Sequence, residues 1–170
     1  MRKAAVVLFV IVSIISSCEN KKEISSISPV NWNKRTIYNS LSDTLKFGKT
    51  YLAVYSQIYN STEHRTHDLT ATISIRNTNL KDTIYIQKAD YYNTKGNLIR
   101  TYFNKTIYIL PLETVEIVID ESDKEGGTGA NFVFHWMTNP TLNEPLFEAV
   151  MISTTGQQGL SFTTQGKKIN

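Results

Sequence analysis

Residues 120–136 read DESDKEGGTGANFVFHW and contain the features that decide the fold of this chain. The second half of this stretch places Phe132, Phe134 and Trp136 at every other position. Successive side chains of a β-strand point to opposite faces of a sheet, so this spacing predicts a strand with one aromatic face. The acidic, glycine-rich first half predicts a sharp bend before the strand, because glycine tolerates the backbone angles of tight turns.

Strand-like alternation continues on both sides of this stretch. Apolar and polar residues alternate over 69–76 and 115–120, and Asn93-Thr94-Lys95-Gly96 is typical of a hairpin turn. Further strand candidates are residues 51–59, 83–92, 98–108, 146–153 and 160–164. No window after residue 18 has the apolar periodicity of a helix. The sequence therefore predicts an all-β fold, a single antiparallel β-sandwich of about eight strands that is immunoglobulin-like in architecture, with a small barrel as the alternative.

Length and charge exclude several classes of protein. With 170 residues, 41% of them hydrophobic, the chain can bury one sizeable core. Its formal net charge of +3 includes Arg2 and Lys3, and removing both would leave 16 basic and 15 acidic residues, a net charge of +1. A nearly neutral domain lacks the electrostatic surface of nucleic-acid-binding proteins, so no nucleic-acid partner is expected.

The N-terminal residues have the organisation of an export signal. Two basic residues, Arg2 and Lys3, precede a mostly apolar segment over 4–15, which is too short for the ~20 residues of a membrane span. The sequence Ile-Ser-Ser-Cys that ends at Cys18 resembles the signal of bacterial lipoproteins, in which the cysteine is lipidated and the chain is cleaved before it. We therefore predict a lipoprotein signal peptide over 1–17 and lipidation of Cys18, and an uncleaved anchor or ordinary secretion is the alternative.

A tether and one domain account for the rest of the chain. Residues 18–49 show no sustained period and predict a flexible tether with one short ordered piece near 35–41, and residues 50–170 contain the predicted sandwich. Cys18 is the only cysteine, which leaves no thiol for a disulfide, a metal ligand or a nucleophile. Glu19 follows it, which resembles lipoproteins sorted to the outer membrane, facing the periplasm or the cell surface.

Five segments of the predicted domain carry a resemblance to known proteins: residues 70–79 (TATISIRNTN), 90–92 (DYY), 126–132 (GGTGANF), 148–153 (EAVMIS) and 158–163 (QGLSFT). Together they resemble a bacterial family of exported proteins catalogued as domain of unknown function thirty-one twenty-four, and the resemblance spans about residues 51–166. It implies location in the cell envelope and one β-rich domain. It implies no activity, because none is established for the family.

The acidic bend is a candidate calcium loop. Glu121, Asp123 and Glu125 stand at the first, third and fifth positions of a loop with Gly126 at the sixth, as in oxygen-lined calcium loops. The twelfth position is Phe132 rather than a bidentate glutamate, which departs from the pattern. A solvated acidic bend is the alternative.

Two further groups are candidate binding residues. His64 and His67, in the sequence His-Arg-Thr-His, are candidate zinc ligands that would need partners from another loop. Residues Gly127, Thr128, Gly129 and Asn131 form a candidate ligand-binding loop, because consecutive backbone N–H groups can hold an anion. Solvated histidines and a structural glycine turn are the alternatives, since no Walker-type lysine follows the glycines.

Strand direction suggests where these groups lie. If successive strands are antiparallel, the loops at 60–67, 93–97, 121–130 and 154–158 meet at one end of the sandwich. This holds if Asn104-Lys105 is a kink within one long strand, whereas a true turn there would move the last two loops to the opposite end.

No catalytic residues are predicted, and the expected function is non-enzymatic. The preferred hypothesis is an envelope lipoprotein that acts as a binding or interaction module, attached to the membrane through its lipid and facing an envelope protein or glycan partner. The first alternative is a domain that binds Ca²⁺, Zn²⁺ or a small ligand with the loops at one end. The second is an enzyme that acts on envelope polymers, suggested by the acidic and histidine-bearing loops.

Overall fold

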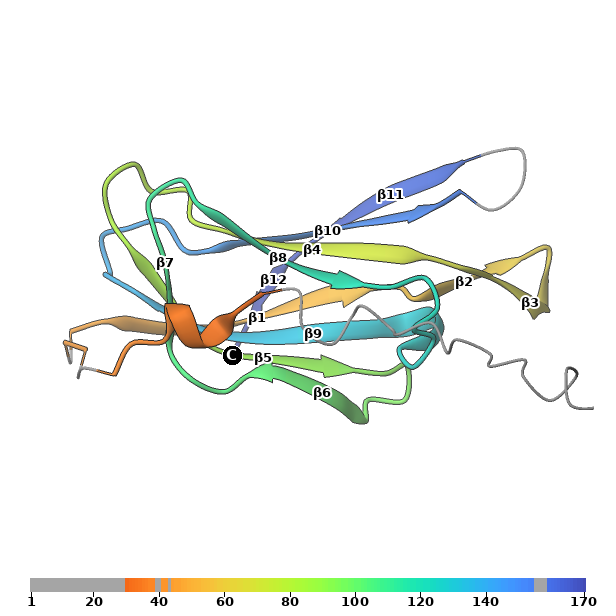
Figure 1. The fold of residues 1–170 in the computed structure, drawn as a ribbon, viewed down its shortest axis with the longest axis horizontal. Coiled ribbons are helices and arrows are strands. Elements are labelled where there is room, and N and C mark those ends of the chain that lie inside the picture. Colours follow the sequence, from red (N-terminus) through yellow and green to blue (C-terminus); the bar gives the residue numbers. More distant parts are fainter. Residues whose placement is uncertain (1–29, 39–40, 43, 155–158) are drawn as a thin grey trace, which may run out of the picture.

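The computed structural model describes residues 30–38, 41–42, 44–154 and 159–170. The chain forms an all-β sandwich of two antiparallel sheets, which confirms the predicted fold class (Figure 1). The predicted signal peptide and Cys18 lie outside the described residues. Among the described residues, no helix is long and apolar enough to cross a membrane.

The larger sheet has six strands in the order β12-β1-β9-β5-β6, with β7 paired to β5. Its strands are β1 (Lys46–Val54), β5 (Ile84–Tyr92), β6 (Leu98–Phe103), β7 (Ile107–Ile109), β9 (Ala130–Thr138) and β12 (Lys167–Ile169). The smaller sheet has four strands in the order β11-β10-β4-β8. Its strands are β4 (Thr70–Arg76), β8 (Thr114–Ile119), β10 (Leu146–Ser153) and β11 (Leu160–Gln165).

A two-stranded ribbon and two short 3-10 turns complete the described part of the chain. The ribbon pairs β2 (Gln57–Asn60) with β3 (Thr62–Asp68), and the turns are η2 (Trp32–Arg35) and η3 (Gly127–Gly129). The prediction of a loop over 60–67 is therefore wrong. The residues of β3 are mostly exposed, so the strand has no apolar alternation by which the sequence could have revealed it.

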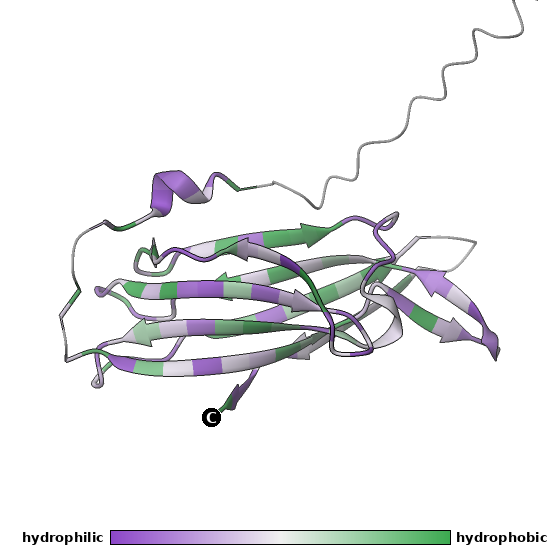
Figure 2. Cartoon of the chain, turned by 90° about the horizontal axis from the view of Figure 1, so that it is seen from below, coloured by the Kyte–Doolittle hydropathy of each residue, from purple (hydrophilic) through white to green (hydrophobic). Residues whose placement is uncertain are grey.

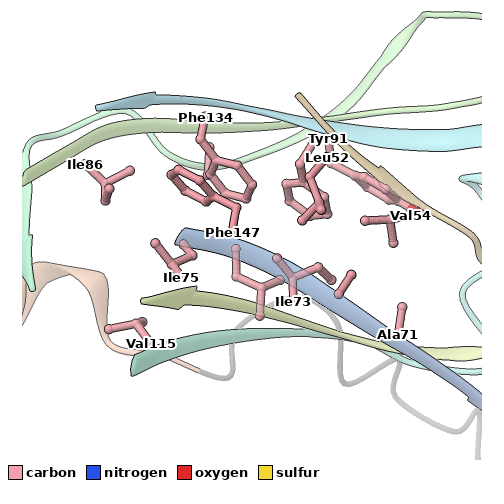
Figure 3. Packing of buried hydrophobic residues seen from close by; sticks show 14 of the residues in the cluster. Leu52, Val54, Ala71, Ile73, Ile75, Ile86, Tyr91, Val115, Phe134 and Phe147 are labelled. Atoms are coloured by element: carbon pink, nitrogen blue, oxygen red, sulfur yellow. The ribbon is translucent and has the colours of Figure 1, made fainter. Parts of the chain in front are cut away.

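The core depends on the aromatic face predicted from Phe132, Phe134 and Trp136. Strand β9 lies between β1 and β5, and its Phe132, Phe134 and Trp136 are buried (Figure 3 shows Phe134). The Phe134 ring stacks on Phe147 of the opposite sheet with 4.4 Å between ring centroids, and on Phe132 with 5.3 Å. Along the strands, hydrophilic and hydrophobic residues alternate (Figure 2), as expected for sheets with one buried and one exposed face.

Residues Asn104 and Lys105 form a kink in one long path. Both β6 and β7 pair antiparallel with β5, through Ala89 opposite Phe103 and Ile84 opposite Ile109. The two short strands therefore run in the same direction, away from the 93–97 turn. Strand β8 then returns, so the 121–130 bend lies at the same end of the sandwich as the 93–97 turn. This interruption, the ribbon and the short β12 raise the number of strands in the described residues to twelve, against the eight or so expected.

Close packing at Gly48 gives a test of this core. Gly48 lies opposite Trp136 in the pairing of β1 and β9, and a Cβ added there would overlap the indole ring. We expect Gly48→Ala to lower the free energy of unfolding by about 1–3 kcal/mol, because overpacking forces the ring or the strand to move. Chemical denaturation of both proteins measures the difference.

The matched control is Gly159→Ala. A Cβ added at Gly159 meets its nearest atom at 3.9 Å, an ordinary contact distance. This variant should stay within about 0.5 kcal/mol of the original chain. Equal stabilities for the two variants would contradict the assigned pairing of β1 with β9.

Candidate functional site

Two of the four loops predicted to meet, 93–97 and 121–130, are brought together at one end of the sandwich, here called the loop end, and the base of the ribbon joins them there. The Thr94 amide donates to the Gly126 carbonyl over 3.0 Å, and the Ser56 amide donates to the Gly127 carbonyl over 3.2 Å. Lys124 pairs with Asp68, the last residue of the ribbon, at 2.6 Å. Residues 155–158 of the fourth predicted loop, 154–158, lie outside the described residues.

Arg100 occupies the centre of the loop end. Its guanidinium lies 3.0 Å from the Asp123 carboxylate and 3.2 Å from that of Glu125, and it donates to the Tyr102 hydroxyl over 3.0 Å. The Asp123 side chain is 1% exposed, so this carboxylate is paired inside the protein. A cation supplied by the chain thus occupies the position where the calcium-loop hypothesis places a metal ion.

The predicted metal ligands do not form one site. His64 lies on exposed β3 with its Nε2 3.2 Å from the neighbouring Glu63 carboxylate, and His67 lies opposite Ile58 in the ribbon. Glu121 stays within the bend. In the described part of the chain, no three His, Cys, Asp or Glu side chains are grouped so as to hold a metal ion. These ligands were predicted from their spacing along the chain, whereas in the structure Asp123 and Glu125 form ion pairs with Arg100.

The predicted ligand-binding residues 127–129 form the turn η3, which is tied to the 93–97 turn. The Gly129 amide donates to the Thr94 hydroxyl over 2.9 Å, and the Gly127 amide donates to the Lys124 carbonyl over 3.1 Å. Gly127 has a φ of +72°, which glycine adopts more readily than other residues. Asn131 pairs with Tyr92 within the larger sheet. Two of the amides that could hold an anion are therefore bound within the protein.

Buried tyrosines complete the polar interior of the loop end. Burial raises the pKa of Tyr91 to about 12, and its hydroxyl bonds the Ser56 hydroxyl at 2.8 Å. Burial also raises the pKa of Tyr102. Burial alone would lower the pKa of Arg100, but interactions with Tyr102 and Asp123 outweigh it and raise that pKa. The raised pKa values keep both tyrosines neutral and Arg100 charged near neutral pH.

A groove of about 580 Å³, here called the aromatic–amide groove, lies beside the Asn104-Lys105 kink. One wall comes from the segment around η2 and the other from β6 and the kink. Its lining residues are Val30, Asn31, Trp32, Asn33, Thr36, Tyr102, Phe103, Asn104 and Lys105. The lining thus contains three aromatic rings, three carboxamides and one ammonium group, and none of these residues carries a carboxylate or an imidazole.

The η2 wall is held to the sandwich by several contacts. The rings of Trp32 and Phe103 lie 4.6 Å apart between centroids, and the Ile37 amide donates to the Thr106 carbonyl over 2.8 Å. Arg35 pairs with Glu113 at 2.7 Å, and this hydrogen bond lowers the pKa of the Glu113 carboxyl. The groove is therefore a formed feature of the fold.

Sequence reasoning did not identify this groove. The segment over 18–49 was predicted to be a tether with one short ordered piece near 35–41, whereas its residues 30–33 and Thr36 form one wall of the groove. The available signal was Asn31-Trp32-Asn33, a tryptophan between two carboxamides in an otherwise polar region. The other wall contains the kink at Asn104-Lys105, for which the sequence predicted only an effect on strand direction.

Comparisons with known proteins identify a family without assigning an activity. Residues 48–169 match the family model described as "Protein of unknown function (DUF3124)". No curated protein matches the chain. Among solved structures, "Crystal Structure of Thermotoga maritima 1070" is similar at 11% sequence identity with a TM-score of 0.45, over 71% of this chain and 92% of that chain.

The Arg100 cluster gives a test of the loop end. We expect Arg100→Ala to lower the free energy of unfolding by about 3 kcal/mol, because it leaves the buried Asp123 carboxylate without its partner. Urea denaturation near neutral pH measures the change. Arg65→Ala, on the exposed strand β3, is the matched control and should be nearly neutral. Equal effects of the two variants would show that Asp123 does not depend on Arg100.

Proposed function

The chain belongs to the DUF3124 family, whose description assigns no activity, and from this premise we propose that it is a lipid-anchored envelope protein that binds glycan. Cys18 carries the lipid, and the β-sandwich is a non-enzymatic binding module. The aromatic–amide groove is its binding site. The protein resides at the outer membrane and faces the periplasm or the cell surface.

The anchor is supported by the N-terminal sequence. A basic pair and an apolar segment of signal-peptide length precede Cys18, the only cysteine, at the position where lipoproteins carry their lipid. Stable attachment by lipid needs more than one acyl chain, which lipoprotein processing supplies. A short stretch then separates the anchor from Val30 on the wall of the groove.

The composition of the groove carries the glycan proposal. Its volume of about 580 Å³ is within the range of small-ligand sites, roughly 300–1,000 Å³. Aromatic rings such as Trp32 offer flat apolar surface that packs on the apolar face of a sugar ring. The carboxamides of Asn31, Asn33 and Asn104 each offer a donor and an acceptor, which matches hydroxyl and acetamido groups. Lys105 adds a cation suited to an acidic substituent.

The same lining favours binding over catalysis. Glycoside hydrolysis uses a pair of carboxyl groups beside the scissile bond. The lining residues include no carboxylate, and Asp123 and Glu125 at the loop end are paired with Arg100. A bound sugar would therefore be held without the acid and base that bond cleavage requires.

Replacement of Cys18 tests the anchor. Expressed in a bacterium with lipoprotein-processing enzymes, the original chain should lose residues 1–17 and gain acyl groups at Cys18. Cys18→Ala should keep its leader and carry no lipid, because the thiol that accepts the lipid is gone. Ser17→Ala, which keeps a small residue before the cysteine, should be processed normally. Intact-mass spectrometry distinguishes these products, and an intact Met1 with unmodified sulfur in the original chain would refute the anchor.

Fluorescence titration tests the glycan site. The probes are tetra-N-acetylglucosamine and purified peptidoglycan, added to the full chain in detergent. Trp32 lines the groove whereas Trp136 is buried, so sugar binding should change the Trp32 emission. Asn104→Ala should weaken binding about fivefold, equivalent to about 1 kcal/mol for one hydrogen-bonding group.

The control for this titration is Tyr59→Ala. Tyr59 is an exposed aromatic residue on β2 and does not line the groove, so its loss should leave affinity unchanged. If neither probe alters Trp32 emission at millimolar concentration, or if Tyr59→Ala weakens binding as much as Asn104→Ala does, the groove is not a glycan site.

A further inference from the structure

Three leucines are exposed on two loops at the end of the sandwich opposite the loop end. Leu80 is 76% exposed, Leu112 is 64% exposed and Leu110 is 50% exposed. Leu80 lies in the connection from β4 to β5, and the other two lie in the turn from β7 to β8 (Figure 1). We call this group the leucine tip. Single exposed apolar residues are ordinary, but three on adjacent loops form a patch that favours an apolar partner.

Buried asparagines hold the two loops together. The Leu112 amide donates to the Asn79 carbonyl over 3.2 Å. The Asn77 side-chain amide donates to the carbonyls of Leu110, Ile109 and Asp82 over 3.0, 3.1 and 2.7 Å. Asn77 and Asn79 are 2% and 6% exposed. The leucines are therefore presented by a fixed pair of loops.

The backbone at Leu112 is unusual for its residue type. Leu112 has a φ of 57°, in the left-handed region that favours glycine or asparagine. A leucine here opposes both the local backbone preference and the preference of leucine for burial. An apolar partner outside the protein would satisfy the side chain.

Val30, the first residue that the structure describes, lies beside the leucine tip. Val30 and Leu110 line the same groove of about 380 Å³, and the Arg35–Glu113 pair holds the η2 segment to the turn between β7 and β8. Val30 follows Cys18 by twelve residues. Twelve residues span at most about 43 Å when extended, and about 20 Å as a flexible coil. A lipid on Cys18 would thus keep Val30, which lies beside the leucine tip, within about 43 Å of the membrane.

Exposed lysines border the leucines. Lys81 follows Leu80, and Lys34 lines the groove that contains Leu110. Glu113 is already paired with Arg35, and Asp82 is the exposed acidic residue in the same loop as Lys81. Leucines flanked by lysines suit the bilayer interface, where apolar groups enter the acyl boundary and cations remain near anionic headgroups.

We propose that the leucine tip contacts the bilayer to which the chain is anchored, with Leu80, Leu110 and Leu112 entering its interface. This inference rests on the lipid anchor of the proposed function. The anchor raises the local concentration of membrane around the tip, so a small apolar patch suffices for contact. The contact directs the loop end and the ribbon away from the membrane.

A fluorescent probe on Leu112 tests this contact. The full, lipidated Leu112→Cys chain is labelled with an environment-sensitive thiol dye and placed in vesicles of phosphatidylethanolamine and phosphatidylglycerol. Lipidation consumes the Cys18 thiol, so the new cysteine is the labelled site. Nitroxide groups in the upper acyl region should quench about half of the emission or more, because interfacial segments lie about 5–10 Å into this boundary.

Leu98→Cys is the matched control. Leu98 is 52% exposed and begins β6, directly after the 93–97 turn at the loop end. Its probe should show little quenching. Leu80→Cys provides a second position at the leucine tip and should behave like Leu112→Cys.

The outcomes separate this proposal from the anchor. If vesicle flotation and intact mass show a lipidated, membrane-bound chain while both tip probes are unquenched, or quenched no more than Leu98, the tip contact is refuted and the anchor stands. If the mass shows an unmodified Cys18, the anchor and the tip proposal fail together. Strong quenching at both tip positions with little at Leu98 supports the contact.

Discussion

Aromatic stacking across the two sheets is the interaction on which this structure depends. Phe134 contacts Phe132 along β9 and Phe147 on the facing strand β10, and Tyr91 stacks on Phe132 with 4.7 Å between centroids. Each such pair contributes about 0.5–1.5 kcal/mol beyond the burial of its rings. Because β9 lies between β1 and β5 in the larger sheet, this row of rings lies at the centre of the core, and the Phe134–Phe147 pair joins the larger sheet to the smaller one.

The two ends of the sandwich use their polar groups differently. At the loop end, Arg100 neutralises Asp123 and Glu125, and Thr94 binds the backbone of the glycine turn. Burial of a carboxylate is tolerated only when a partner compensates the lost hydration, and Arg100 does so for the buried Asp123, whereas the Glu125 side chain is 62% exposed. At the opposite end, the side chains of Asn77 and Asn79 bind the backbone carbonyls of Leu110 and Asn143, and the leucines of the leucine tip remain exposed.

The segment around η2 links the sandwich to the anchor proposed upstream. Trp32 packs on Phe103, and Arg35 bonds Glu113, so this short turn is part of the folded surface. The same residues form one wall of the aromatic–amide groove and lie beside Leu110. In the proposed arrangement, the aromatic–amide groove therefore binds an envelope glycan near the membrane. The chain between Cys18 and Val30 limits the distance of the groove from the membrane.

The sequence by itself determined the main strands and the fold class, because two-residue alternation such as Phe132, Phe134 and Trp136 is a local property of an extended chain. It also determined the family, because residues 48–169 match the family model. It also indicated that the 93–97 and 121–130 loops meet. Only the tertiary structure decided that Arg100 takes the carboxylates expected to bind calcium, and that Trp32 and Asn104 face one groove. The residues of each pair lie far apart in the chain. Their contact depends on the order of the strands in the sheet and on the β6–β7 kink, and no local sequence pattern predicts either.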